Sequence, residues 1–341
     1  MSTQQLLDTV KKLFADDKGI LAMDESAHTC NEHFSTVGVP QTEAARRDWR
    51  ELIITTSGLA ESISGVILYD ETIRQQKLDG TPFIQLLKDA DILIGIKVDT
   101  GAKAMIGNPS ETITEGLDGL PERLAEYAQL GARFAKWRAV FHLGIGLPSQ
   151  ACIDANCIAL ANYAKLCHQA GLVPIVEPEI LMEGTHTQAE CYSATEKVLS
   201  NLFQQLDREH VSLDAVILKP NMVLAGLTCP QQITREEVSE ATLQCLRQKV
   251  PATVGGIVFL SGGQSPHLAS ARLNQMEIQQ HKSPLPWPLG FSFARALQQP
   301  ALTIWHGNPA NKSAAQHALL HRAKCDRAAR RGEYTVQMER L

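Results

Sequence analysis

The chain has 341 residues, of which 44% are apolar and 20% charged, a composition that excludes a disordered or fibrous protein. Its 37 acidic and 32 basic residues give a net charge of −5, so no excess of positive charge is available for general binding to nucleic acid. No stretch approaches 18 consecutive apolar residues, and the N-terminus lacks a basic start followed by a long apolar run. We therefore expect a cytoplasmic protein with no membrane partner.

Eight short apolar runs recur along the chain, and each ends at a polar or charged residue. Runs of this length, rich in β-branched and aromatic residues, are typical of strands buried on both faces. They cover residues 19–23, 65–69, 92–96, 132–135, 172–176, 215–218, 256–260 and 289–294. Helical patterns precede, separate and follow them, at residues 6–14, 121–131, 149–169, 234–250 and 311–330.

Strands that alternate with helices predict a parallel sheet, and eight of them favour a closed (β/α)8 barrel. The alternative is an open, doubly wound sheet, which would favour a glycine-rich turn after the first strand. Here that turn reads Asp24-Glu25-Ser26-Ala27-His28, without glycine. Because the sequence contains no linker or repeat, we expect one barrel domain over residues 1–341, with an extra N-terminal and an extra C-terminal helix.

Charged side chains gather at the predicted C-terminal ends of the strands, where such a barrel keeps its active site. Residues two positions apart on a strand point to the same face. Three such pairs are Lys97 with Asp99, Lys136 with Arg138, and Glu177 with Glu179. We expect these side chains to converge at one mouth of the barrel.

Lys219 is the candidate nucleophile. It follows Ala-Val-Ile-Leu and precedes Pro220, which places it at a buried strand end. Burial disfavours the charged ammonium, and a neutral lysine amine attacks carbonyl carbons. The alternative is a structural lysine paired with Glu177 or Glu179. That pairing is compatible with catalysis, because the same carboxylates can move protons to and from the amine.

A phosphate site is predicted after the last two strands, in the loops that often bind phosphate in these barrels. The first loop reads Ser261-Gly262-Gly263-Gln264, and its glycines let backbone N–H groups approach an anion. Arg295 follows the last strand and can donate two hydrogen bonds to the same anion.

Other candidates are interpreted as structural. His317 and His321 have a possible metal spacing but no third ligand nearby in the sequence, so we expect no metal and no cofactor. The basic run 322–331 is interpreted as a solvated helix face, and Trp137 as packing outward against a helix. The eight cysteines include no C-x-x-C pair and are predicted to be buried thiols.

Six segments together resemble the class I, Schiff-base-forming fructose-bisphosphate aldolases. They are Gly19-Ile-Leu-Ala-Met-Asp-Glu-Ser26, Gly95-Ile-Lys-Val-Asp99, Phe134-Ala-Lys-Trp-Arg138, Ile175-Val-Glu-Pro-Glu-Ile180, Leu218-Lys-Pro-Asn-Met222 and Phe259-Leu-Ser-Gly-Gly-Gln264. The resemblance implies a barrel, usually a homotetramer, that acts in glycolysis without a metal. It cleaves a phosphorylated sugar, fructose 1,6-bisphosphate, to dihydroxyacetone phosphate and glyceraldehyde 3-phosphate.

The resemblance also implies roles for individual residues. Lys219 resembles the Schiff-base lysine and Glu177 the proton acceptor. Glu179, Lys136 and Asp24 resemble the proton-handling and electrostatic partners. The loop with Ser261, Gly262 and Gly263, together with Arg295, resembles the site for the phosphate nearest the ketone. Ser26, Lys97 and Arg138 resemble the far-phosphate or substrate-binding side.

The sequence departs from the family pattern at three places. Glu32-His33 stands where a Lys-Arg pair is usual, so we expect a weaker grip on the far phosphate. Thr100 stands where a lysine is common. The last residues, 334–341, do not include the family's long tail with a terminal tyrosine. Two alternatives therefore stay open: an aldolase for another ketose such as fructose 1-phosphate, and a non-catalytic scaffold on this fold, against which the intact lysine and carboxylates argue.

Overall fold

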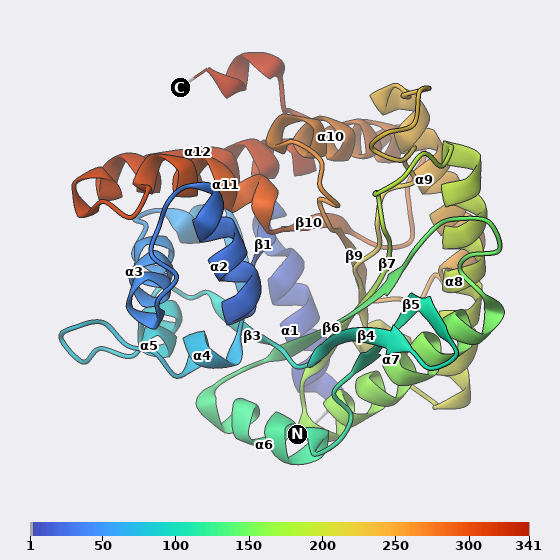
Figure 1. The fold of residues 1–341 in the computed structure, drawn as a ribbon, viewed down its shortest axis with the longest axis horizontal. Helices are drawn as coiled ribbons and strands as arrows, with labels where there is room; N and C mark the ends of the chain where they lie inside the picture. The colour runs from blue at the N-terminus through green and yellow to red at the C-terminus, as the bar shows by residue number, and fades with distance from the viewer. Residues whose placement is uncertain (1–2, 341) are drawn as a thin grey trace.

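The computed structural model describes residues 3–340; Met1, Ser2 and Leu341, which belong to the two chain ends considered above, lie outside the described residues. Eight parallel strands close into a barrel in the order β1-β10-β9-β8-β7-β6-β3-β2 (Figure 1). Their bounds are β1 Gly19–Met23, β2 Ile63–Leu68, β3 Leu93–Lys97, β6 Phe134–Phe141, β7 Val173–Ile180, β8 Ile217–Leu218, β9 Gly256–Phe259 and β10 Leu289–Phe293. The predicted (β/α)8 barrel is confirmed.

Helices surround the barrel and extend it at both ends of the chain. The α-helices are α1 Thr3–Phe14, α2 Ala27–Thr36, α3 Glu43–Ile54, α4 Asp70–Ile73, α5 Phe83–Asp89, α6 Leu120–Leu130, α7 Gln150–Ala170, α8 Gln188–Arg208, α9 Arg235–Lys249, α10 Pro266–Lys282, α11 Arg295–Trp305 and α12 Lys312–Arg330. Single 3-10 turns cover Ala15–Asp17, Leu59–Glu61, Leu213–Ala215, Pro309–Asn311 and Val336–Glu339. The extra N-terminal and C-terminal helices, α1 and α12, are therefore confirmed.

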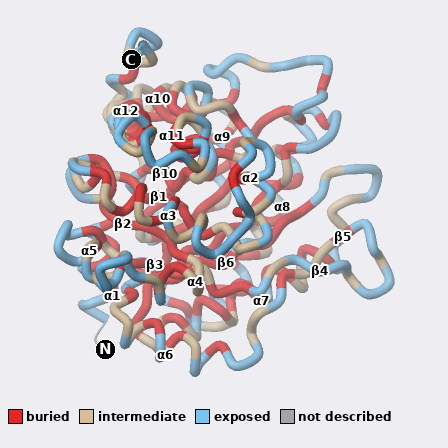
Figure 2. The backbone as a smooth tube through the Cα atoms, turned by 60° about the vertical axis from the view of Figure 1, so that its left-hand side comes forward, coloured by how far each residue is buried: buried red, intermediate tan, exposed pale blue. Residues whose placement is uncertain are grey.

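Apolar side chains fill the N-terminal end of the barrel. Phe134, Ile175 and Ile217 point inward and pack with Leu13 of α1 in one buried cluster. At Gly95 a Cβ atom would lie 2.1 Å from a ring carbon of Phe134, so only glycine leaves room for this ring. The barrel is thus a packed core at this end, and Figure 2 shows its strands as buried.

The charged residues continue these inward rows towards the C-terminal end. Lys136 lies two residues after Phe134, Glu177 two after Ile175, and Lys219 two after Ile217. Side chains two positions apart share a face, so the same alternation that packs the core aims these groups into the mouth. Trp137 has the opposite parity and packs on Tyr163 of α7, with ring centroids 5.5 Å apart, as predicted.

Two strands run further than the sequence pattern indicated. β6 and β7 continue to Phe141 and Ile180, whereas the apolar runs ended at residues 135 and 176. Lys136, Arg138, Glu177 and Glu179 were predicted to follow the apolar part of each strand, but they lie within β6 and β7, where they form ion pairs. Strand β8 is shorter than its predicted run of residues 215–218 and covers only Ile217–Leu218.

An antiparallel hairpin, β4 Gly101–Met105 with β5 Asn108–Glu115, was not predicted. Its residues are mostly polar, so it lacks the apolar pattern of the barrel strands. It packs over the end of β6, where the Thr114 hydroxyl donates to the Arg138 carbonyl oxygen at 2.8 Å.

The prediction of a solvated basic face over residues 322–331 is wrong for Arg322 and Arg330, which are both buried. Arg330 donates to backbone carbonyl oxygens of Phe14, Lys18 and Leu289, so it joins α12 to the start of β1 and β10. All eight cysteines are free and buried, as predicted. In the described part of the chain, no helix is long and apolar enough to cross a membrane.

Candidate active site

A cavity of about 590 Å³ opens at the C-terminal ends of the barrel strands. Its size lies within the range of ordinary small-molecule sites. All twelve site residues predicted from the sequence line it: Asp24, Ser26, Lys97, Lys136, Arg138, Glu177, Glu179, Lys219, Ser261, Gly262, Gly263 and Arg295. They come from seven of the eight strands or the loops that follow them, so the fold brings together residues far apart in the chain.

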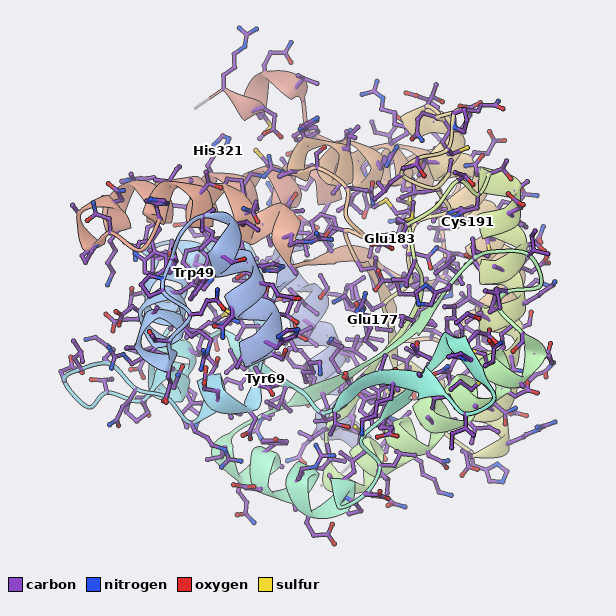
Figure 3. All side chains as sticks on the ribbon, viewed as in Figure 1. Trp49, Tyr69, Glu177, Glu183, Cys191 and His321 are labelled. Atoms are coloured by element: carbon purple, nitrogen blue, oxygen red, sulfur yellow. The ribbon has the colours of Figure 1, made fainter. Side chains whose placement is uncertain are left out.

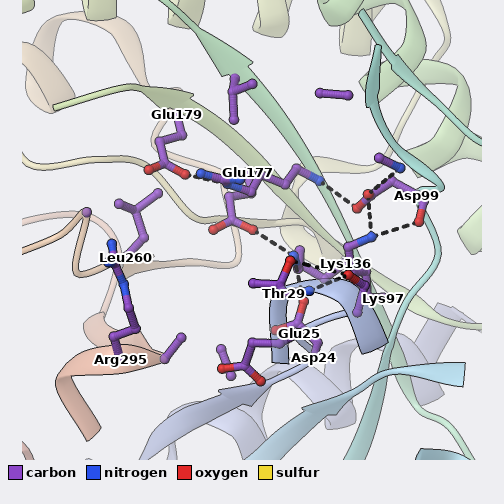
Figure 4. A pocket seen from close by; sticks show the side chains of 18 of the residues that line it. Asp24, Glu25, Thr29, Lys97, Asp99, Lys136, Glu177, Glu179, Leu260 and Arg295 are labelled. Atoms are coloured by element: carbon purple, nitrogen blue, oxygen red, sulfur yellow. Dashed lines mark hydrogen bonds and ion pairs between the residues drawn. The ribbon is translucent and has the colours of Figure 1, made fainter. Parts of the chain in front are cut away.

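Two lysines and two carboxylates form a buried chain in the cavity. Figure 4 labels three of its members, Asp24, Lys136 and Glu177. Lys219 Nζ lies 3.1 Å from Glu177 Oε1, and Lys136 Nζ lies 3.2 Å from Glu177 Oε2. Lys136 Nζ also lies 2.7 Å from Asp24 Oδ2. Glu177 Oε2 accepts no hydrogen bond from residues 3–340, although the Lys136 ammonium lies 3.2 Å away. That oxygen therefore keeps a lone pair available for a proton.

The charges in this chain stabilise one another. Burial alone raises the pKa of Asp24, but Lys136 and then Lys219 more than offset it and hold the pKa at about 2. Burial likewise opposes ionisation of Glu177, yet the two lysines keep its pKa below the usual range. Burial disfavours the Lys136 ammonium, but Asp24 and Glu177 raise its pKa above the usual range. At neutral pH Lys136 is therefore a fixed cation, and both carboxylates are ionised.

A second charged group lies between this chain and the hairpin. Lys97 Nζ is 2.6 Å from Asp99 Oδ1, and Arg138 Nε is 2.5 Å from Glu179 Oε2. Asp99 Oδ2 also accepts from the backbone N–H of Arg138, at 3.2 Å. The predicted convergence of these same-face residues at one mouth is confirmed, since all six line the cavity, and Asp99 contacts both Lys97 and the backbone of Arg138.

The loops after β9 and β10 form one wall of the cavity. Gly262 and Gly263 have φ of 54° and 77°, a left-handed conformation that favours glycine. Arg295 begins α11, and one of its guanidinium nitrogens lies 3.5 Å from where a Cβ of Gly263 would stand. The arginine and the glycine turn are therefore adjacent, as a shared anion site requires.

The N-terminus of α2 forms another wall. Ser26 caps this helix by accepting from the Thr29 backbone N–H, and the two hydroxyl oxygens are 3.2 Å apart. Thr29 was not among the predicted site residues, although its place one helical turn after Ser26 could have indicated it. Helix N-termini favour anions, so this wall suits a second phosphate.

A buried network behind this wall was also missed. Arg50 of α3 is 2.9 Å from Glu25, and Gln298 of α11 donates to Glu25 and to the Ala22 carbonyl oxygen, each at 2.8 Å. These contacts fix the turn that carries Asp24 and Ser26. Local sequence offers no signal for them, because Arg50 and Gln298 are 25 and 273 residues from Glu25.

Of the two residues that differ from the family's basic pair, Glu32 does not line the cavity. Glu32 is exposed and lies 3.3 Å from His28, which does line it. His33 does line the cavity. Successive helical residues point about 100° apart, so the two positions on α2 cannot share one face. Thr100 lines the cavity, and nothing in the structure explains its difference from the family pattern.

A group of potential metal ligands lies away from the cavity. His321, Cys325 and Glu339 place ligand atoms within 4.8 Å of one another, and Figure 3 shows His321 on the C-terminal helix, remote from Glu177. Glu339 already accepts from Arg322 at 2.5 Å and from the Tyr334 hydroxyl at 2.6 Å. These contacts give the group a structural role in holding the C-terminal segment against α12.

Comparisons with known proteins point to one family. A family model described as fructose-bisphosphate aldolase class-I matches residues 5–341. A probable fructose-bisphosphate aldolase class 1 of Xanthomonas campestris pv. campestris is 49% identical over 335 residues, which cover 98% of this chain and 99% of that protein. Fructose-bisphosphate aldolase B of Gallus gallus is 45% identical over 332 residues, or 97% and 91% of the two chains. The fructose-bisphosphate aldolase of Plasmodium falciparum, solved in complex with TRAP and an inhibitor, superposes with a TM-score of 0.95 at 42% identity, covering 97% and 95%.

Proposed function

Since the chain belongs to the class I fructose-bisphosphate aldolase family, we propose that its cavity cleaves fructose 1,6-bisphosphate through an imine at Lys219. The observation that carries this proposal is the buried chain Lys219–Glu177–Lys136–Asp24. It places a lysine amine next to a carboxylate that can take and return its protons, at the base of a cavity with anion-binding walls at two places.

The first half of the reaction builds an electron sink. The Lys219 amine attacks the C2 ketone, and the resulting carbinolamine loses water to give an iminium. Glu177 takes a proton from the attacking amine and delivers one to the departing hydroxyl. Lys136, held as a cation by Asp24 and Glu177, stabilises negative charge that develops on the oxygens in these steps.

The second half breaks the carbon skeleton. A carboxylate, Glu177 or Asp24, removes the C4 hydroxyl proton, and the C3–C4 electron pair moves into the iminium. Glyceraldehyde 3-phosphate leaves, and an enamine of dihydroxyacetone phosphate remains on Lys219. Protonation at C3 and attack of water at C2 then release dihydroxyacetone phosphate and the free amine. Glu179 forms an ion pair with Arg138 at the wall of the same cavity, with 2.5 Å between Arg138 Nε and Glu179 Oε2.

We propose that the two walls bind the two ends of the substrate. We place the phosphate nearest the ketone at Ser261, Gly262, Gly263 and Arg295. The far phosphate lies towards Ser26, Lys97 and Arg138. The test is a direct comparison of kcat/KM for fructose 1,6-bisphosphate and fructose 1-phosphate, with both products identified. A higher kcat/KM for the bisphosphate supports the assignment, and equal or lower values would reject two phosphate sites.

Activity is expected to survive removal of metals. The iminium accepts the electron pair of the breaking bond, so the reaction does not require a divalent Lewis acid. We predict unchanged kcat and KM after dialysis against excess EDTA. A loss of activity that only a divalent metal restores would contradict this mechanism.

Changing Glu32 and His33 is expected to alter substrate preference. We predict that Glu32→Lys with His33→Arg raises the preference for the bisphosphate over fructose 1-phosphate by about tenfold, because a charge-assisted contact to phosphate contributes roughly 1.5–3 kcal/mol and 1.4 kcal/mol is tenfold. Since only His33 lines the cavity, His33→Arg alone should give most of the change, and Glu32→Lys little. An unchanged ratio of kcat/KM values in the double variant would show that neither position affects the phosphate.

His33 also predicts a pH dependence. Burial, assisted by Arg295, lowers the pKa of His33, although Glu25 acts in the opposite direction. The ring is therefore neutral at neutral pH and gains its charge only below its ordinary value of 6.5. We expect KM for the bisphosphate to improve as pH falls through that lower range. The His33→Gln protein is the control, since the substrate phosphate titrates nearby.

We further propose a cytosolic homotetramer in which residues 1–341 form one barrel domain. A cytosolic aldolase of Arabidopsis thaliana, 47% identical over 317 residues, supports the location. The tetramer follows from the family resemblance, and sedimentation of the purified protein tests it.

A further inference from the structure

Arg272 of α10 is a buried cation without a counter-charge. It is only 8% exposed, and no carboxylate oxygen of residues 3–340 lies within 4.0 Å of it. Among these residues its single hydrogen bond runs from Nη1 to Gln264 Oε1, at 2.7 Å, and Nε has no partner. Burial lowers the pKa of Arg272, and no neighbouring charge offsets this. A cation in such a place costs stability.

The other buried arginines of the described chain differ from Arg272. Arg50 lies 2.9 Å from a glutamate and Arg322 lies 3.4 Å from an aspartate. Arg330 donates to three backbone carbonyl oxygens. Arg272 alone has one neutral partner, so its environment does not explain why a charged residue stands there.

The partner of Arg272 supports the glycine turn of the cavity. Gln264 is itself buried, and its Nε2 donates to the Ser261 carbonyl oxygen at 2.9 Å. Its backbone N–H donates to the same oxygen at 3.1 Å. Two side-chain hydrogen bonds thus connect the Arg272 guanidinium to the residue that begins the turn Ser261-Gly262-Gly263.

We propose that Arg272 is a positioning residue for the phosphate nearest the ketone. It orients Gln264, which holds the turn, and its unpaired charge complements the dianion that the turn binds. In a low-dielectric interior this attraction acts beyond direct contact and is weakly screened. The inference rests on the proposed function, because it needs that phosphate at Ser261–Gly263.

The first test measures kcat and the KM of each substrate of the reverse reaction for Arg272→Met. Methionine roughly keeps the side-chain volume but removes the positive charge and the hydrogen-bond donors of the guanidinium. KM for dihydroxyacetone phosphate should rise about tenfold, while KM for glyceraldehyde 3-phosphate and kcat change less than about twofold. Only the former carries the phosphate that the turn binds. Lys282→Met is the control: it removes the same charge from an exposed position on the same helix and should change neither KM.

A second readout separates this role from a structural one. An unpaired buried cation destabilises the fold, so Arg272→Met should keep or raise Tm while it weakens binding. Arg272→Lys, which retains the charge, should recover part of the affinity. Gln264→Met should also raise KM for dihydroxyacetone phosphate, and the double variant should show less than the sum of the two effects.

Three results would overturn the inference: an unchanged KM for dihydroxyacetone phosphate in Arg272→Met, equal increases in both KM values, or a protein that no longer folds. Borohydride trapping at saturating dihydroxyacetone phosphate distinguishes this failure from failure of the proposed function. If the parent and the variant both form the adduct and bind dihydroxyacetone phosphate with equal affinity, only the role of Arg272 is rejected. No adduct in the parent protein rejects the mechanism itself.

Discussion

Replacing Lys219 with arginine is expected to reduce cleavage of fructose 1,6-bisphosphate to the assay background. Arginine keeps the positive charge between Glu177 and the cavity but cannot form an imine, and every later step of the reaction passes through that imine. Enzymes typically accelerate their reactions at least 10⁶-fold, so losing the covalent step should cost on the order of 10⁴-fold or more in kcat.

The control for Lys219→Arg is Lys165→Arg, an exposed lysine that pairs with Glu209 at 2.9 Å and lies on the outer helix α7. It should keep full activity. The Tm of both variants shows whether they are folded. Substantial cleavage by a folded Lys219→Arg protein would mean that another group carries the reaction.

Glu177→Gln is expected to lower kcat about 10²- to 10⁴-fold, the usual contribution of a general acid–base group, with a smaller effect on KM. The amide has nearly the same shape, but it cannot accept a proton from Lys219 or return one. It also removes the charge shared by Lys219 and Lys136. Single-turnover measurements should show slower formation of the imine as well as slower cleavage.

Asp24→Asn separates the two candidate bases for the C4 hydroxyl proton. If Asp24 takes that proton, imine formation with dihydroxyacetone phosphate persists while cleavage falls. If Glu177 takes it, cleavage in Asp24→Asn falls no more than imine formation does.

Because the lysines hold the pKa of Glu177 below its usual range, the carboxylate stays ionised well below neutral pH. Glu177→Gln should accordingly lack the part of the acid-side loss of activity that protonation of Glu177 causes.

The barrel was predictable because its strands are buried on both faces and its helices on one. This produces short continuous apolar runs that alternate with a 3.6-residue pattern. The mouth was predictable for a related reason: Lys136, Glu177 and Lys219 each continue an inward row that begins with an apolar residue. A buried charged side chain requires partners, and the partners from other strands meet at the cavity.

What the sequence did not predict depends on partners far apart in the chain. Arg322 and Arg330 belong to a basic run that is typical of a solvated helix face. Both are nevertheless buried, because they donate to a side chain or a carbonyl oxygen of segments distant in the sequence. Gln298 supports Glu25 across 273 residues. The hairpin β4–β5 carries few apolar residues, and the separate orientations of Glu32 and His33 depend on how α2 is rotated against the barrel.

Peptide mass mapping of the protein after borohydride reduction with dihydroxyacetone phosphate shows which residue carries the imine. We expect one reduced adduct, located on Lys219, that forms in parallel with loss of activity and is absent from Lys219→Arg. An adduct on another lysine, or an adduct of equal yield in Lys219→Arg, would rule out the imine at Lys219.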